Sequence, residues 1–126
     1  MQPFDGNIEQ LTLDNTFFRK VIYTGPHSQL VVMSLKPTEE IGLETHSEND
    51  QFIRVEKGFG KAIIGGDEYS LEDGVAVVVP AGTEHNIINT SDSAPMQLYT
   101  IYSPAHHADG TIHETKEEAM KAEAQE

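Results

Sequence analysis

The sequence contains no cysteine and few basic residues. Without thiols the chain can form neither disulfides nor thiolate metal sites such as iron–sulfur clusters. Eight Lys and Arg stand against 21 Asp and Glu, which gives a formal charge of -13. Nucleic acid and anionic membrane surfaces bind proteins through basic patches, and no such patch is visible here. Both are therefore disfavoured as partners.

A long apolar segment is also missing. The longest uninterrupted apolar run covers residues 75–81, far short of the roughly 20 residues of a membrane-spanning helix. The first residues, 1–6, are polar and turn-like and do not resemble a signal peptide. We therefore expect a soluble, cytoplasmic protein. At 126 residues the chain is long enough for one domain, residues 1–126, with its own hydrophobic core.

The chain is instead rich in short runs of β-branched and aromatic residues separated by turn residues. Turn signals recur roughly every eight to twelve residues, a spacing typical of an antiparallel sandwich or small barrel rather than of β–α–β units. We therefore predict an all-β fold. The predicted strands cover residues 17–23, 29–35, 51–56, 61–64, 68–71, 75–79, 85–89 and 96–102.

The two ends of the chain depart from this pattern. Residues 1–16 are polar with sparse apolar positions, which predicts an irregular start or a short edge strand. Near the other end, Thr115 followed three positions later by Glu118 matches a capping box. Ala, Glu and Lys dominate the residues that follow. We predict a barrel core over about residues 17–103 and a tail with a short C-terminal helix over residues 104–126.

The first stretch that could carry chemistry covers residues 44–58. Because side chains alternate faces along a strand, Glu44 and His46 point the same way. Gln51 falls on the opposite parity, but a turn or bulge at Asn49–Asp50 can reset the phase. Gln51 is then expected to face the interior with the other two side chains.

The second stretch covers residues 74–89 and places His85 just after a Pro-x-Gly turn. If the two stretches lie side by side in one barrel, four side chains can converge on one cation: Glu44, His46, Gln51 and His85. Two imidazoles, one carboxylate and one amide oxygen suit a divalent first-row metal such as Mn, Fe, Zn or Ni. On an octahedral ion, four such ligands leave positions for water or substrate.

The other histidines lie in loops without spaced partners, and we interpret them as surface residues. They are His27, His106, His107 and His113. The last three form a loose cluster that could bind stray metal, but solvation at the surface is the simpler interpretation.

At this point the sequence resembles a known superfamily, the cupins. The second stretch matches their second motif at each defined position: Gly74, Pro80, Gly82, His85 and Asn89. The first motif usually contains His-x-His, three or four intervening residues, a Glu, six further residues and a Gly. In this chain Gln51 stands at the Glu position, and Gly58 follows at the right distance.

The rest of the first motif departs from the family pattern. Counting back from Gln51 places His46 at the second His position and Glu44 at the first. The alternative register pairs His46 with Glu48 and leaves a gap one residue shorter than usual, so we favour Glu44. The opening glycine of the motif is also absent, because Thr38 stands in its place.

The resemblance covers about residues 31–102. It implies a small monocupin: an antiparallel double-stranded β-helix, or jelly roll, with one metal inside the barrel, commonly as a homodimer. The ligand set looks like that of small cupins acting on uronate sugars and of manganese-type hydroxynitrile lyases. We therefore expect a metal-dependent isomerase or lyase for a small oxygenated metabolite, such as a sugar acid or a keto or hydroxy acid. Glu48 is the candidate catalytic base, followed by Tyr99 and Tyr102.

Two other functions stay open on the sequence. Two histidines and one glutamate resemble the facial triad of non-haem Fe(II) oxygenases, although Gln51 fills a position that such enzymes leave open. A non-enzymatic cupin that binds a small molecule or a metal is the third possibility, because no acid–base pair is evident in the sequence.

Overall fold

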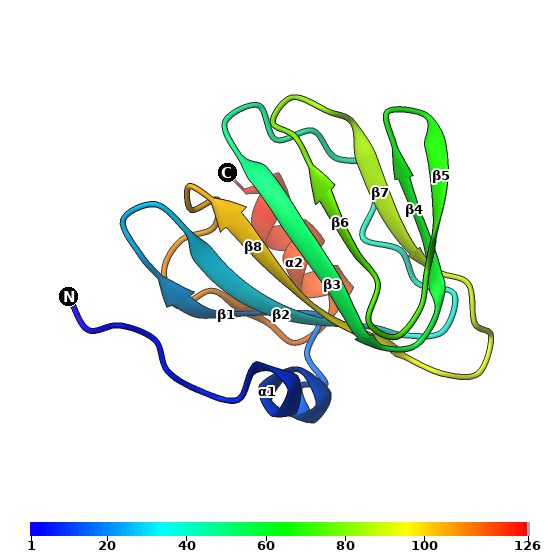
Figure 1. Ribbon diagram of the computed structural model, residues 1–126, viewed down its shortest axis with the longest axis horizontal. Helices are drawn as coiled ribbons and strands as arrows, with labels where there is room; N and C mark the ends of the chain where they lie inside the picture. The colour runs from blue at the N-terminus through cyan, green and yellow to red at the C-terminus, as the bar shows by residue number, and fades with distance from the viewer. Residues whose placement is uncertain (126) are drawn as a thin grey trace.

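The computed structural model describes residues 1–125 and contains two antiparallel sheets (Figure 1). The strands are β1 (Arg19–Thr24), β2 (Gln29–Leu35), β3 (Asp50–Lys57), β4 (Gly60–Ile64), β5 (Asp67–Leu71), β6 (Ala76–Val79), β7 (His85–Asn89), β8 (Met96–Ser103) and β9 (Ile112–His113). The larger sheet has the order β6-β3-β8-β2-β1-β9, and the smaller sheet has the order β5-β4-β7. Together they form the predicted double-stranded β-helix.

Each of the predicted strands is present, and the alternation of faces in β3 is confirmed. Gln51, Ile53 and Val55 are buried, whereas Phe52 and Arg54 are partly exposed. The polar segment before β3 therefore resets the phase and turns Gln51 inward. The two residues of β9 pair with β1; this strand was not predicted, because so short a segment carries no periodic pattern.

The N-terminal segment begins irregularly, as predicted, but the prediction of no helix there is wrong, because residues Ile8–Asp14 form helix α1. Asn7 caps this helix, because its side chain accepts a hydrogen bond of 3.0 Å from the backbone N–H of Gln10. At the other end, Gln97 Nε2 donates to the carbonyl oxygen of Leu13 at 2.7 Å. The helix packs against β2, β3 and β8.

The predicted C-terminal helix is confirmed as α2 (Lys116–Ala124). Thr115 Oγ1 accepts a hydrogen bond of 3.1 Å from the N–H of Glu118, which is half of the capping box. The Glu118 carboxylate accepts from the N–H of Glu114 at 2.9 Å. Ala119 is buried in the hydrophobic core and anchors the helix. Neither helix within residues 1–125 has the length and apolar character needed to cross a bilayer.

The core lies between the two sheets. Its buried apolar side chains include Val31, Met33, Ile53, Val55 and Leu98 from the larger sheet, and Ala62 and Ile87 from the smaller sheet. Buried polar side chains lie beside this core, among them His46, Gln51 and His85. Buried polar groups cost free energy unless they are paired, so this group is the natural place to look for a site.

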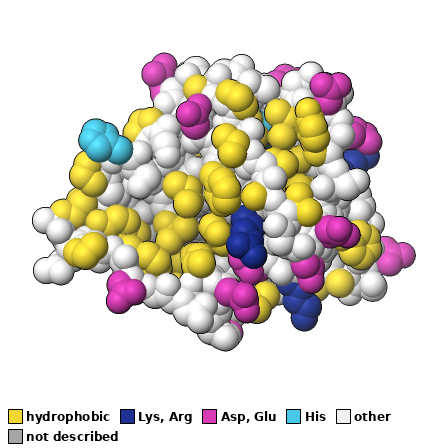
Figure 2. Space-filling view, in the orientation of Figure 1, with side chains coloured by type: hydrophobic (Ala, Val, Ile, Leu, Met, Phe, Trp, Pro, Cys, Tyr) yellow, Lys and Arg dark blue, Asp and Glu magenta, His cyan; other side chains and the backbone are white. Residues whose placement is uncertain are grey.

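The outer face of the larger sheet carries a row of apolar side chains that runs across five strands. Directly paired positions supply it: Val78, Phe52, Ile101, Leu30 and Tyr23. Val78 is 60% exposed, and the other four are partly exposed. Figure 2 shows apolar side chains gathered on this side of the molecule. We call this set the apolar row.

Candidate metal centre

Glu44 and His85 face each other across an isolated antiparallel bridge. The N–H of each residue donates to the carbonyl oxygen of the other, and both distances are 2.9 Å. Residues that are directly opposed in this way project their side chains to the same face. The backbone pairing therefore brings Glu44 to His85.

Several residues of the second stretch, residues 74–89, fix the backbone around the site. Gly82 has a φ of +83°, which favours glycine, and its N–H donates to the carbonyl oxygen of His46 at 2.9 Å. Asn86 Oδ1 accepts from the N–H of Gly42 at 2.9 Å. Asn89 is buried, and its amide donates to three backbone carbonyl groups. The contacts of Gly82 and Asn86 tie the segment around Glu44 and His46 to the turn before β7 and to β7 itself. Those of Asn89 hold the end of β2 and the loop after β7.

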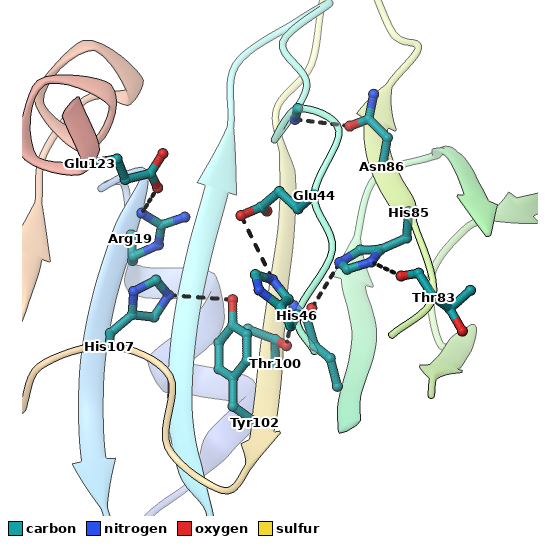
Figure 3. A network of polar contacts seen from close by, with 12 residues as sticks. Arg19, Glu44, His46, Thr83, His85, Asn86, Thr100, Tyr102, His107 and Glu123 are labelled. Carbon is teal, nitrogen blue, oxygen red and sulfur yellow. Dashed lines mark hydrogen bonds and ion pairs between the residues drawn. The ribbon is translucent and has the colours of Figure 1, made fainter. Parts of the chain in front are cut away.

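His46 completes a compact group with Glu44 and His85 (Figure 3). His46 Nε2 lies 3.7 Å from Glu44 Oε2, and the centroids of the two imidazole rings are 5.2 Å apart. One potential ligand atom from each of the three side chains lies within 4.8 Å of the others. The structure thus brings together three of the four predicted ligands.

The fourth predicted ligand, Gln51, lies next to His85. His85 Nδ1 is 2.9 Å from the carbonyl oxygen of Thr83, which can only accept, so Nδ1 carries the hydrogen of the neutral ring and Nε2 presents a lone pair. Gln51 Nε2 donates to Thr100 Oγ1 at 3.0 Å, which turns Oε1 toward His85 Nε2 at 3.1 Å. With the His85 ring in the tautomer that carries its hydrogen on Nδ1, two acceptors face each other, an arrangement that a shared cation stabilises.

The spacing fits a first-row divalent ion. With bonds of about 2.1 Å, two ligands lie about 3.0 Å apart when they are at right angles and about 4.2 Å apart when they are opposite. The pair Gln51–His85 at 3.1 Å and the pair Glu44–His46 at 3.7 Å fall in this range. Within the described part of the chain, His46 Nε2 is also buried without a hydrogen-bond partner, and a bond to a metal would remove the cost of that burial.

Burial disfavours the charged forms of Glu44 and His46 when no ion is bound. Desolvation raises the pKa of Glu44 from 4.5 to about 7, and the positive charge of Arg19 opposes part of this rise. Desolvation also lowers the pKa of His46 from 6.5 to about 4, with His106 adding to the effect. A dication at this place would favour the ionised form of Glu44.

The three candidates for proton transfer lie in different surroundings. Glu48 is exposed in a turn and is not among the side chains whose ligand atoms converge. The Tyr99 ring lies 6.1 Å from that of Phe52, on the outer face of the larger sheet. Tyr102 is 2% exposed, and its ring lies 5.6 Å from that of His46. Burial raises the pKa of Tyr102 above its usual value, so this hydroxyl serves as a hydrogen-bond donor.

A cavity of about 500 Å³ opens beside the group. Glu44 and His46 form part of its wall, and most of the other wall residues come from β1, the segment 104–113 and α2: Arg19, His106, His107, His113 and Glu123. These three histidines therefore lie together at the site and are not merely solvated surface residues, although His106 is exposed. His27 is exposed in the turn after β1, as expected. The His106 ring lies 4.1 Å from that of His46.

Sequence reasoning missed Arg19 and these histidines for a physical reason. Tertiary structure brings them to the site, because the segment after β8 returns across the barrel to pair with β1. Their spacing along the sequence does not indicate this. No motif links them to the two stretches that carry the ligands. The one available signal was the number of histidines in that segment.

Comparisons with known proteins agree with this architecture. A family model described as a cupin domain matches residues 31–102. The uncharacterized protein L612 of Acanthamoeba polyphaga mimivirus is 50% identical over 114 residues, which cover 88% of this chain and 71% of that protein. The uncharacterized protein YrkC of Bacillus subtilis (strain 168) is 46% identical over 128 residues, which cover 97% of this chain and 68% of that protein. The crystal structure of BH2720 from Bacillus halodurans is 44% identical, covers 95% of both chains and superposes with a TM-score of 0.92.

Proposed function

Because this chain belongs to the cupin domain family, we propose that it is a metal-dependent enzyme of the isomerase or lyase type. Its substrate would be a small oxygenated metabolite such as a sugar acid or a keto or hydroxy acid. The observation that carries this proposal is the convergence of Glu44, His46 and His85 at a cavity of about 500 Å³. Cavities of this size suit a small ligand.

Four side chains would hold one divalent ion, Mn, Fe, Zn or Ni: Glu44, His46, Gln51 and His85. When bound, the ion supplies Lewis acidity toward a carbonyl or hydroxyl oxygen. One carboxylate against a dication leaves the centre with a net charge of about +1, so this acidity is kept. Thr83 would orient His85, and Thr100 would orient Gln51, through the hydrogen bonds described above.

Proton transfer needs a group that reaches the cavity. Glu48 stays a candidate base from the sequence, but it is not among the residues that line the cavity. His106 lines the cavity beside His46, and imidazoles are the commonest general bases. We therefore assign the base role to His106 ahead of Glu48, with the buried Tyr102 as a hydrogen-bond donor.

The test combines metal analysis with turnover. The purified protein is analysed for bound metal and assayed on a panel of sugar acids, keto acids and hydroxy acids, before and after chelation and reloading. His46→Ala and His85→Ala should each reduce metal binding from one ion per chain to almost none and should abolish turnover. His27→Ala makes the same change in an exposed turn and should leave both unchanged. A wild-type protein that binds no divalent metal would refute the proposal.

The oxygenase alternative rests on one observation: the three converging residues are two histidines and one carboxylate, the composition of a facial triad. It requires oxygen consumption by the Fe(II)-loaded protein with a diketone or thiol, whereas an isomerase or lyase consumes none. Ligand binding without any turnover across both panels would favour a non-enzymatic binding protein.

We also propose that the protein forms a homodimer through the apolar row. Exposed apolar patches of this kind usually mark an interaction surface, and a second copy would cover Val78, which is 60% exposed. Val78→Lys should convert the dimer to a monomer in light-scattering measurements. Ser70→Lys, on β5 of the smaller sheet, is the control and should not. A wild-type protein that is already monomeric at high concentration would refute this proposal.

A further inference from the structure

Arg19 is a buried cation in the wall of the cavity. Its side chain is 2% exposed, and its guanidinium carbon lies 5.3 Å from the centroid of the Phe18 ring. Removing a guanidinium from water costs several kcal/mol, as an order of magnitude, unless an anion and hydrogen bonds compensate. A cation in this position therefore calls for a well-placed anionic partner.

The side chains that contact the Arg19 guanidinium compensate little of the cost of burying its charge. Arg19 Nη1 is 3.4 Å from Glu123 Oε1 and 3.4 Å from His113 Nδ1. A charge-assisted hydrogen bond is usually about 2.7–2.9 Å long, and carboxylates often bind arginine in a two-pronged manner. Arg19 Nε is buried and has no hydrogen-bond partner among residues 1–125. Part of the guanidinium fork is thus left for another anion.

Glu123 is a weak partner that a ligand can replace. It belongs to the last turn of α2, and its side chain is 51% exposed. Ion pairs with a solvent-exposed member contribute little free energy. The carboxylate nevertheless lies at the cavity wall with Arg19, where a carboxylate from solution would bind.

We propose that Arg19 binds the carboxylate of the substrate and that Glu123 occupies this position until the substrate displaces it. Arg19, Glu44 and His46 line one cavity, so a single small molecule can place its carboxylate on Arg19 and another oxygen toward the metal ligands. The inference rests on the proposed metal-dependent function and narrows its substrates to acids. Neutral sugars and simple alcohols are excluded, because they carry no carboxylate to replace that of Glu123 at Arg19.

The decisive variant is Glu123→Ala, which removes the competing carboxylate from an exposed position and keeps Arg19 and the metal ligands. Binding is measured by calorimetry on the Mn²⁺-loaded full chain with pyruvate, glycolate and galacturonate. Each is paired with its uncharged counterpart: acetone, ethylene glycol and galactose. The Kd of at least one acid should fall by up to about fivefold, the equivalent of an exposed ion pair. The uncharged counterparts should not bind.

The matched control is Glu117→Ala, which changes the net charge equally on the same helix. Glu117 pairs with Lys121 at 3.1 Å and does not line the cavity, so its removal should leave the Kd unchanged. Arg19→Gln should weaken acid binding by more than about tenfold, since a charge-assisted pair is lost, and Arg19→Lys should restore part of it. Circular dichroism and the Mn²⁺ stoichiometry verify that each variant is folded and loaded.

The outcomes separate this inference from the proposed function. If Mn²⁺ binds but Glu123→Ala and Glu117→Ala shift the Kd equally, or galactose binds as well as galacturonate, the role of Arg19 is refuted and the metal centre stands. If no metal binds, the proposed function fails. The same titrations on the metal-free protein then decide whether Arg19 still binds carboxylates.

Discussion

Replacing Glu44 with glutamine should remove a pH-dependent component of metal binding. The pKa of Glu44 is raised by burial to about 7, so at pH 7 about half of the metal-free molecules carry a proton on this carboxyl. A metal ion must displace that proton to bind. The apparent affinity therefore falls as the pH drops below about 7 and levels off above about 8.

The size of this loss of metal affinity follows from the ionised fraction of Glu44. Between about pH 8 and pH 6 this fraction falls about tenfold, and at about pH 5 it has fallen about a hundredfold. The corresponding losses of binding free energy are about 1.4 and 2.8 kcal/mol. With the ordinary pKa of 4.5, the loss over the whole interval would be less than about twofold.

Calorimetric titration with Mn²⁺ in pairs of buffers of different ionisation enthalpy measures both the affinity and the protons released. At about pH 6, wild type should release close to one proton more than Glu44→Gln, which keeps an oxygen ligand but cannot ionise. Taking the difference between the two proteins removes contributions from other groups. Glu48→Gln makes the same exchange in the exposed turn and should behave like wild type.

Two results would refute this reasoning. Equal proton release by wild type and Glu44→Gln would mean that Glu44 does not bind the ion as a carboxylate. Loss of the pH-dependent component in Glu48→Gln instead would mean that the alternative register of the first motif is correct.

Three further predictions concern single side chains. Thr38 has a φ of +65°, so Thr38→Gly should raise the free energy of unfolding by about 1 kcal/mol in denaturant titrations, because a β-branched residue is strained there. Asn89→Ala removes donors from carbonyl groups of Leu35, Lys36 and Ala94 and should lower that free energy by about 2–4 kcal/mol; an unchanged denaturation midpoint would contradict it. Gln51→Glu should tighten Mn²⁺ binding by at least about tenfold, since a carboxylate is the better ligand, and weaker binding in calorimetry would exclude Gln51 as a ligand.

The strands could be predicted because their signals are local. β2 covers the predicted residues 29–35, since a β-branched run is bounded by turn residues on both sides. The alternation in β3 likewise placed Gln51 on the buried face. The second motif led to His85 because its residues stabilise the turn and the loop around that histidine, as the contacts of Gly82 and Asn89 illustrate.

Other parts of the site depend on long-range placement and leave no local signal. Arg19 lies in an apolar strand run, where an arginine is usually read as facing solvent, yet it is buried in the cavity wall. Helix α1 was missed because its apolar positions are few, although Asn7 offered a capping signal. The preference for Glu44 over Glu48 came from family spacing, whereas its physical basis is the backbone pairing with His85.

The segment that carries Glu44 and His46 joins the smaller sheet through isolated bridges at Glu40 and Glu44, and not through a continuous ladder. Such a connection opens locally at a lower free energy than a strand within a sheet. A metal ion bound by Glu44 and His46 on this segment and by His85 on β7 would hold the segment against the smaller sheet. The residence time of the ion would then depend on how often this segment opens while the rest of the barrel stays folded. The same opening would determine how strongly the backbone amides of the segment are protected from hydrogen–deuterium exchange.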